Sequence, residues 1–385
     1  MAMILKNARI FLAGKGFVPG GLCIEQDRIA ELFIDREMPK EGEDLQGDLI
    51  LPGLIDMHIH GCLGQDCSDA DAAGLDKIAS FLAGRGITSF APTTMTLPHE
   101  ELLKALSVIA EAAVSLPPGR ARIAGIHMEG PYLSVEKKGA HKEAYLRLPD
   151  EVEFSVLQKA AGGRIRIIDV APELPGAEEF IRKVSKDTAV SIAHTCAGHA
   201  TASAAFSAGA RHVTHLFNAM PPMLHREPGV IGAAAERMDV TAELICDGFH
   251  VHPAAVRAAF HLFPHRICMI SDAIRCMGMP DGGYVCGGQE VILKDGEARL
   301  GDGTIAGSVT DLYEAMCRAI RFGVPAEEAV EAASITPAAV LGIAGQTGSI
   351  EEGKLADLIV CDQDYHRKRV ILGGREVTGK QGVRA

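Results

Sequence analysis

The chain has 385 residues, which is long for one ordinary domain and suits a barrel with a small appendage. Its net charge of −12 argues against general binding of nucleic acid or of an anionic membrane surface, although it leaves room for a small anionic substrate. Charges interrupt every apolar run before it reaches roughly 18 residues, so we expect no membrane span. The ten cysteines lack CxxC spacing and the first residues lack the layout of a secretory signal, so we expect reduced cysteines in a cytoplasmic protein.

Both ends of the chain are predicted to form β structure. Residues 1–51 contain short alternating segments separated by turn glycines, and residues 345–385 have the same character. Neither end carries enough apolar residues for a core of its own. We therefore expect the two ends to pack together as one small β-sandwich domain, which leaves residues 52–344 as the catalytic domain.

The middle of the chain alternates short apolar runs with helical patterns. The first run ends at His60, and the helix expected next, over Asp71–Gly84, has apolar residues at the 3.6-residue spacing of an amphipathic helix. Seven further strand-like runs follow, over 88–94, 122–129, 165–171, 189–194, 212–216, 240–246 and 266–272. Eight buried runs separated by helices predict a closed, parallel (β/α)₈ TIM-like barrel.

A doubly wound open sheet is the alternative architecture. We disfavour it because no Gly-rich phosphate fingerprint opens any of the βα units. A further Gly-rich stretch, over residues 281–303, is expected to form a hairpin inserted after the eighth strand.

Two histidines close the first strand-like run, in the segment PGLIDMHIHG at residues 52–61. Successive side chains on a strand alternate between its faces, so His58 and His60 point the same way, with Cα atoms roughly 6.5–7 Å apart. Two imidazoles at that distance can converge on one metal ion. The pair taken alone also fits two surface histidines at a strand end.

Polar residues close other runs of the expected barrel as well. The active site of this fold lies at the C-terminal ends of the strands, and a single His, Glu or Asp buried there costs free energy unless it has a partner. We therefore predict a metal site that gathers the polar residues at the ends of strands one, three, five, six and eight, namely His58, His60, Glu129, His194, His215 and Asp272.

Imidazole and carboxylate ligands suit Zn²⁺, Fe²⁺, Co²⁺ and Mn²⁺ alike. A metal with an open coordination position lowers the pKa of its bound water toward ~7 and polarises a carbonyl group. Asp272, next to that water, is placed to act first as a general base and then as a general acid. The residues therefore predict hydrolysis of an amide, an ester or another C–N bond.

Several motifs of the chain resemble those of the amidohydrolase superfamily, namely PGLIDMHIHG, the strand-end histidines, SDA at 271–273 and GSIEEGKLADLIV in the tail. The segments HMEGPYLSVEKKGAH (127–141), HLFNAMPPMLHREPG (215–229) and DGFHV (247–251) are similar to one branch, the N-acetylglucosamine-6-phosphate deacetylases. This resemblance covers essentially the whole chain. It implies a metal-dependent hydrolase of amino-sugar catabolism that converts N-acetyl-D-glucosamine 6-phosphate into D-glucosamine 6-phosphate and acetate.

The resemblance implies a role for each matching residue at the reaction centre. Asp272 matches the catalytic acid and base. His141 matches a residue that hydrogen-bonds the acetamido carbonyl and stabilises the developing oxyanion, with Ala140 beside it. The ligands of the primary metal ion are matched by Glu129, His194 and His215.

The remaining matches concern substrate binding. The phosphate is implied to bind the backbone at Asn218 and Ala219 and the side chains of Arg226 and His250, within one subunit or across a homodimer. An arginine in a polar loop is otherwise a solvated charge, and a loop histidine is otherwise a surface residue, so these assignments depend on the resemblance. The loops implied to hold the sugar contribute Asp247, Gly248, His250, Ile305, Ala306 and Gly307.

The fourth strand-like run and the HxH pair both bear on the number of metal ions. Many two-metal amidohydrolases bridge their ions with a carboxylated lysine on strand four, but the run over 165–171 contains no lysine, and Glu129 can supply the carboxylate instead. This disfavours dihydroorotase-like and hydantoinase-like ring openers. Some relatives of the deacetylase branch replace the HxH pair and work with one ion, so the presence of His58 and His60 indicates a second metal site.

Two alternatives to the expected activity stay open at this stage. The first is the same chemistry on N-acetylgalactosamine 6-phosphate, which differs in the configuration of one hydroxyl. The second is a non-catalytic scaffold, which predicts decayed ligands, whereas this chain keeps all of them together with Asp272. The expected partner is a small phosphorylated amino sugar.

Overall fold

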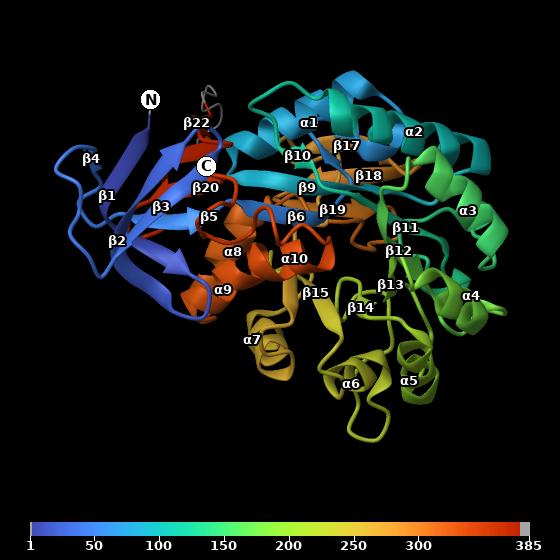
Figure 1. Ribbon diagram of the computed structural model, residues 1–385. Helices are drawn as coiled ribbons and strands as arrows, with labels where there is room; N and C mark the ends of the chain where they lie inside the picture. The colour runs from blue at the N-terminus through green and yellow to red at the C-terminus, as the bar shows by residue number, and fades with distance from the viewer. Residues whose placement is uncertain (1, 378–385) are drawn as a thin grey trace.

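The computed structural model describes residues 2–377, which form a barrel and a sheet built from both ends of the chain (Figure 1). A parallel bridge between Ile59 and Ala273 closes the barrel between its first and eighth strands. The predicted (β/α)₈ barrel is therefore confirmed. Its parallel strands, in order around the wall, are β6 (Leu54–Ile59), β9 (Ile87–Thr94), β11 (Ile126–Tyr132), β12 (Ile165–Val170), β13 (Ala189–Ile192), β14 (His212–Val213), β15 (Thr241–Ile245) and β16 (Ile267–Ile270).

Several strand boundaries differ from the predicted ones. The run over 122–129 divides into the short β10 (Arg122–Ile123) and β11, both of which pair with β9. Strands β13, β14 and β16 end earlier than predicted. They end because the chain turns out of the ladder, with a positive φ at the second residue after each strand: His194, His215 and Asp272.

Helices cover the outside of the barrel (Figure 1). The first begins after Asp71, whose side chain accepts a hydrogen bond from the Ala73 N–H at 3.0 Å and so caps the helix, and it ends at Gly84 as predicted. The α-helices described are α1 (Ala72–Gly84), α2 (His99–Ser115), α3 (Glu151–Ala160), α4 (Ala177–Val184), α5 (His199–Ala208), α6 (Gly229–Ala235), α7 (Pro253–Leu262), α8 (Leu312–Arg321), α9 (Ala326–Ala333) and α10 (Ile335–Val340).

Two small antiparallel sheets lie in loops of the barrel. The Gly-rich stretch after the eighth strand forms a three-stranded sheet, which is one strand more than the predicted hairpin. Its strands are β17 (Gly282–Cys286), β18 (Gln289–Lys294) and β19 (Glu297–Leu300). The loop after β6 contains the short pair β7 (Gly61–Cys62) and β8 (Gln65–Asp66).

The two chain ends form one sheet, and they share a separate apolar cluster that joins Leu5, Leu22 and Ile50 to Leu358 and Ile371. The expectation that the ends fold together is therefore confirmed. The predicted tail residues 378–385 lie outside the described residues. The strands of this sheet are β1 (Met3–Leu12), β2 (Gly16–Glu25), β3 (Arg28–Ile34), β4 (Glu43–Asp44), β5 (Leu49–Pro52), β20 (Leu358–Cys361), β21 (Arg367–Leu372) and β22 (Arg375–Glu376).

No helix within residues 2–377 combines the length and the apolar character needed to cross a bilayer. All ten cysteines are free thiols. Nine of them are buried, and Cys196 is half-buried, which agrees with the expectation of reduced core residues.

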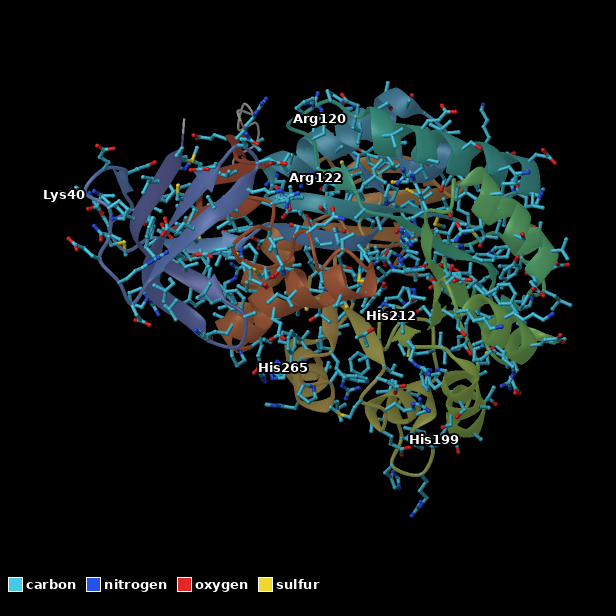
Figure 2. All side chains as sticks on the ribbon, viewed as in Figure 1. Lys40, Arg120, Arg122, His199, His212 and His265 are labelled. Atoms are coloured by element: carbon cyan, nitrogen blue, oxygen red, sulfur yellow. The ribbon has the colours of Figure 1, made fainter. Side chains whose placement is uncertain are left out.

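An ion pair joins the barrel to the terminal sheet. Arg122 donates to both carboxylate oxygens of Asp357, at 2.6 and 3.1 Å, and the Asp357 side chain has no exposed surface. The same carboxylate also accepts hydrogen bonds from Thr347 Oγ1 (3.0 Å) and from the Gly373 N–H (2.8 Å). Nearby Arg120 forms a second pair with Asp76, but both of these side chains are partly exposed, at 30% and 38%. Figure 2 labels the two arginines.

We predict that Arg122→Ala lowers the free energy of unfolding by about 2–4 kcal/mol, because it leaves a buried carboxylate without its ion partner. The loss is below that of a fully buried pair because the Arg122 side chain is 36% exposed. The matched control, Arg120→Ala, is expected to cost less than about 1 kcal/mol. Urea denaturation measures both values, and equal losses in the two variants would contradict the prediction.

Candidate metal centre and active site

Glu129 lies in the middle of β11, which continues to Tyr132 beyond the predicted strand end, and at the centre of the buried polar residues. Its Oε1 atom is 3.1 Å from His194 Nε2 and 3.2 Å from His215 Nε2, and the two nitrogens are 3.0 Å apart. A tetrahedral ion with bonds of roughly 2.0–2.1 Å separates its ligand atoms by about 3.3 Å. The three side chains therefore fit three corners of such a site and leave the fourth for water or substrate.

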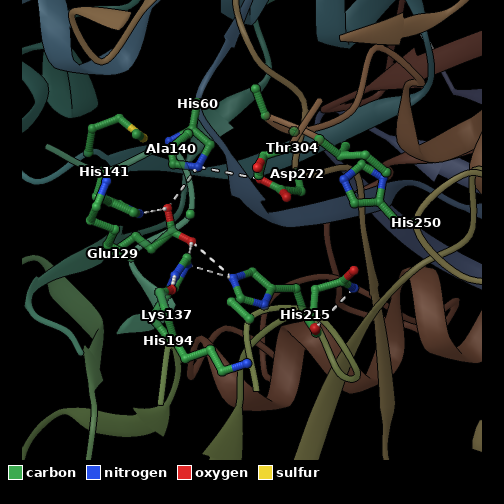
Figure 3. Close-up of a pocket in the computed structure, with 18 of the residues that line it drawn as sticks. His60, Glu129, Lys137, Ala140, His141, His194, His215, His250, Asp272 and Thr304 are labelled. Carbon is green, nitrogen blue, oxygen red and sulfur yellow. Dashed lines mark hydrogen bonds and ion pairs between the residues drawn. The ribbon is translucent and has the colours of Figure 1, made fainter. Parts of the chain in front are cut away.

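A second group of ligand atoms lies on the other side of the same carboxylate. The Nε2 atoms of His58 and His60 are 3.3 Å apart, and Asp272 Oδ1 lies 3.5 and 3.4 Å from them. Glu129 Oε2 is 3.1 Å from His60 Nε2. These separations also match a tetrahedral site. Figure 3 shows Glu129 between His60 on one side and His194 and His215 on the other.

Backbone conformation directs three of these side chains. His194, His215 and Asp272 each lie two residues beyond the end of a strand, and their φ angles are 43°, 31° and 47°. Left-handed conformations cost roughly 1–3 kcal/mol for residues other than glycine and persist where the surroundings impose them. In this barrel they end the ladder and turn His194 and His215 toward Glu129 and Asp272 toward the two histidines of the HxH pair.

The charges of the group shift the pKa of several members. Burial opposes ionisation of Glu129, but its electrostatic interaction with His141 and hydrogen bonds from His141, His194 and His215 outweigh it and hold its pKa well below the usual range. Burial likewise opposes ionisation of Asp272, but the hydrogen bond from His60 and the charge of His58 lower its pKa. Both carboxylates are therefore anions at neutral pH, as cation binding requires.

The same contacts act on the histidines in the opposite direction. Burial opposes protonation of His215, but its hydrogen bond to Glu129 and the charges of both carboxylates outweigh it and raise its pKa to about 9. Burial also opposes protonation of His60, but hydrogen bonds to Asp272 and Glu129 raise its pKa well above the usual value. A cation at this centre must displace these protons.

His141 is placed as a hydrogen-bond donor. The Thr96 N–H donates to His141 Nδ1 at 3.2 Å, so in a neutral ring the proton is on Nε2. Burial lowers the pKa of His141 and favours that neutral ring. Its Nε2 atom faces Glu129 Oε2 at 3.2 Å, beside the pocket. A ring in this state has a proton on Nε2 that it can donate in a hydrogen bond.

These residues border a cavity of about 500 Å³. His58 lies behind its wall with no exposed surface. Arg226, Asp247 and Gly248 do not line it either, and Arg226 is exposed on the loop between β14 and α6. The predicted residues that line it are His60, Glu129, Ala140, His141, His194, His215, Asn218, Ala219, His250, Asp272, Ile305, Ala306 and Gly307.

Two of the residues implied for phosphate and sugar binding have other contacts. Asp247 supports His250 from behind, with Oδ2 2.6 Å from His250 Nδ1. The Asn218 N–H donates to the His215 carbonyl at 2.9 Å, and the Asn218 amide also donates to that carbonyl. Motifs alone do not distinguish residues that face the cavity from residues that position their neighbours.

Several buried polar residues beneath the site were not singled out from the sequence. Glu243 contacts His58, and His127 contacts Asp169 at 3.0 Å. Each interrupts an otherwise apolar run, as Glu129 does, and each would be costly to bury alone. The signal was present, but the prediction considered only the polar residues that close a run.

The family follows from comparison with known proteins. Residues 49–377 match the amidohydrolase family over most of the chain. The chain belongs to the amidohydrolase family. The prediction made from its motifs is thereby confirmed.

Relatives of this amidohydrolase cover nearly its full length. It is 36% identical over 371 residues to the N-acetylglucosamine-6-phosphate deacetylase of Bacillus subtilis (strain 168), with 94% of each chain covered. It is 35% identical over 360 residues to the N-acetylgalactosamine-6-phosphate deacetylase of Escherichia coli O157:H7, with 92% and 95% covered. A mutant N-acetyl-D-glucosamine-6-phosphate deacetylase from Mycobacterium smegmatis, solved with N-acetyl-D-glucosamine-6-phosphate, matches with a TM-score of 0.92 at 32% identity, covering 98% of this chain and 100% of that chain.

We predict that uptake of a divalent ion by the metal-free amidohydrolase releases protons at pH 7. His215, with a pKa of about 9, and His60, whose pKa is also raised, are protonated before the ion takes their place. Metal affinity should therefore increase as the pH rises toward 9 and decrease as the pH falls. Calorimetric titration in buffers of different ionisation enthalpy measures the protons, and a heat that is independent of the buffer would contradict the prediction.

Proposed function

We propose that this amidohydrolase removes the acetyl group from N-acetyl-D-glucosamine 6-phosphate and releases D-glucosamine 6-phosphate and acetate. The observation that carries the proposal is the arrangement of one cavity wall. His141 and Asp272 lie on opposite sides of Glu129 (Figure 3), and the same cavity is lined by His194, His215 and His250. The names of the relatives support the substrate. A non-catalytic scaffold is disfavoured because every expected ligand is present.

The residues divide the chemistry between them. A bound divalent ion supplies polarisation of the acetyl carbonyl and acidification of water. His141 donates its Nε2 proton in a hydrogen bond to the carbonyl oxygen as negative charge develops there. Asp272 takes a proton from the attacking water and returns it to the amide nitrogen as the C–N bond breaks, so that acetate and the free amine leave.

We propose two ions per chain. The support is that Glu129 presents one oxygen to His194 and His215 and the other to His60, while His58 and Asp272 complete the second group. The ligands suit Zn²⁺, Fe²⁺, Co²⁺ or Mn²⁺. Both imidazoles of the HxH pair also turn Nε2 toward Glu129, at 3.6 Å for His58 and 3.1 Å for His60, although this carboxylate already has three other histidine neighbours.

We also propose a cytoplasmic homodimer. Arg226, which the family resemblance implies as a phosphate ligand, is exposed and does not line the cavity of its own chain, whereas His250 does. A second chain that brings its Arg226 to this cavity would complete a phosphate site with a planar, bidentate donor. The free cysteines support a reducing compartment.

N-acetylgalactosamine 6-phosphate is the second candidate substrate, because one relative at 35% identity is named for it. The two sugars require the same hydrolysis and differ in one hydroxyl. Competition between the two phosphorylated sugars at subsaturating concentration measures the ratio of kcat/KM directly. We expect the glucosamine derivative to be preferred.

We predict that acetate release from N-acetyl-D-glucosamine 6-phosphate has a kcat/KM at least roughly tenfold above that for the unphosphorylated sugar, because charged hydrogen bonds to phosphate contribute about 1.5–3 kcal/mol each. Asp272→Asn is the control for the chemistry. It should reduce kcat at least roughly a hundredfold and keep the ion at Glu129, His194 and His215. Equal kcat/KM for the two sugars would exclude the phosphate contacts, and a fully active Asp272→Asn variant would exclude its acid–base role.

A subunit-mixing experiment tests the proposed dimer. Arg226→Ala should lower kcat/KM roughly ten- to hundredfold through loss of a charged hydrogen bond, and Asp272→Asn alone should be nearly inactive. If Arg226 acts across the interface, a heterodimer of the two variants contains one site with both native residues, so mixing should restore activity. Mixed variants that stay as inactive as the separate ones, although mass spectrometry detects the heterodimer, would place Arg226 in its own chain's site.

A further inference from the structure

Glu243 has a buried carboxylate that takes no part in the proposed reaction. It lies in the middle of β15, has no exposed surface and does not line the cavity. Its Oε2 atom is 2.8 Å from His58 Nδ1 and 3.2 Å from the backbone nitrogen of His215. Its Oε1 atom is 3.3 Å from His212 Nε2, on β14, where Figure 2 labels that histidine. One side chain thus reaches residues of two other parts of the barrel wall.

The contact with His58 fixes the state of that imidazole. A carboxylate only accepts hydrogen bonds, so His58 Nδ1 carries a proton, and in the neutral ring that metal binding requires the lone pair is on Nε2, which faces His60 and Asp272. Ligating histidines commonly donate their second ring N–H to a carboxylate or a carbonyl, which fixes both tautomer and orientation. The Lys137 carbonyl has this role for His194, at 2.7 Å from Nδ1.

The contact with His215 replaces part of a strand ladder. The pairing of β14 with β15 ends at Val213 and Ala242, so that His215 lies beyond it in a left-handed conformation. At this point the backbone carbonyl of Glu243 accepts the Leu216 N–H at 2.9 Å, and the carboxylate accepts the His215 N–H. Glu243 therefore accepts hydrogen bonds from the backbone of both His215 and Leu216.

We propose that Glu243 is a positioning residue that holds one ligand from each of the two metal groups, His58 through its ring and His215 through its backbone. The inference rests on the proposed metal-dependent function and deepens it. Glu243 itself does not touch substrate. Its removal acts through the orientation of His58 and His215 and therefore changes metal binding before it changes any chemical step.

The variant Glu243→Gln tests the carboxylate at nearly constant size. One of its two terminal atoms becomes an NH₂ group, which donates and cannot accept. His58 Nδ1 and the His215 N–H both contact Oε2, whereas His212 contacts Oε1. A glutamine oxygen at the Oε2 position therefore gives both ligands a neutral acceptor, which is weaker than the carboxylate, and the opposite orientation of the amide turns its NH₂ group against both of them. Each outcome weakens a metal group.

Asp169→Asn is the matched control. Asp169, on β12, is a carboxylate buried as completely as Glu243 and belongs to the same polar layer. It accepts hydrogen bonds from His127 Nε2 at 3.0 Å and from Thr214 Oγ1 at 2.8 Å, and both partners lie outside the expected ligands. This variant reports the cost of neutralising a buried carboxylate without disturbing a ligand directly.

Metal-stripped wild-type protein and both variants are titrated with Co²⁺, and affinity is measured from its visible absorption and by competition with a chelator. We expect Glu243→Gln to bind its weakest Co²⁺ equivalent at least roughly tenfold less tightly, with a changed absorption spectrum. Asp169→Asn should retain the wild-type affinity and spectrum. Unchanged Co²⁺ affinities in Glu243→Gln, or an equal loss in Asp169→Asn, would overturn the inference.

His58→Asn and the double variant separate positioning from general destabilisation. If Glu243 acts on the second group through His58, adding Glu243→Gln to His58→Asn should not weaken that Co²⁺ equivalent further, whereas additive losses would overturn this part of the inference. The readout needs no substrate. If the wild-type protein is active and Glu243→Gln binds Co²⁺ normally, only the positioning role of Glu243 is excluded. If the wild-type protein binds Co²⁺ but releases no acetate, only the proposed deacetylation is excluded.

Discussion

A carboxylate buried inside a closed barrel destabilises the fold unless its charge is compensated, and Glu129 is compensated on both of its oxygens. Oε1 faces His194 and His215, and Oε2 faces His60 and His141, at 3.1 to 3.2 Å in each case. The histidines in turn could not be buried together without an anion among them. The charges therefore stabilise one another only as a complete group. Removing one member leaves a buried charge without a partner, which destabilises the fold more than replacing the whole group by apolar residues would.

The closure of the barrel serves the same group. The seam between the first and eighth strands is made by hydrogen bonds from the Asp272 N–H to the His58 carbonyl, at 3.0 Å, and from the His60 N–H to the Ala273 carbonyl, at 2.8 Å. Asp272 and the HxH pair thus occupy the two edges that must meet for the barrel to close. A correctly closed barrel brings Asp272, the proposed acid–base residue, to the proposed metal ligands without any separate element to position it.

The sequence was sufficient for the barrel and for predicting that the expected ligands lie together, because a strand has a fixed side-chain period and polar residues stand out against apolar runs. It was not sufficient for the strand boundaries at His194 and His215, which depend on left-handed turns at residues other than glycine. It also did not indicate that Asp247 supports His250 rather than facing the cavity, because that distinction depends on the fold of a loop. Glu243 was overlooked because its role depends on two residues that are distant from it in the chain.

Chemistry and recognition occupy different parts of this fold. The groups expected to hold ions and move protons are buried at strand ends and are fixed by one another, whereas Asn218, His250 and Ile305 border the cavity from loops. Loops can change without disturbing the barrel core. A change in the loop residues that contact one sugar hydroxyl would therefore alter neither the metal centre nor, to any large extent, the percentage of identical residues. This separation explains how relatives named for the two epimers match this chain almost equally, at 36% and 35% identity. The extent of overall similarity therefore does not decide between the two epimers.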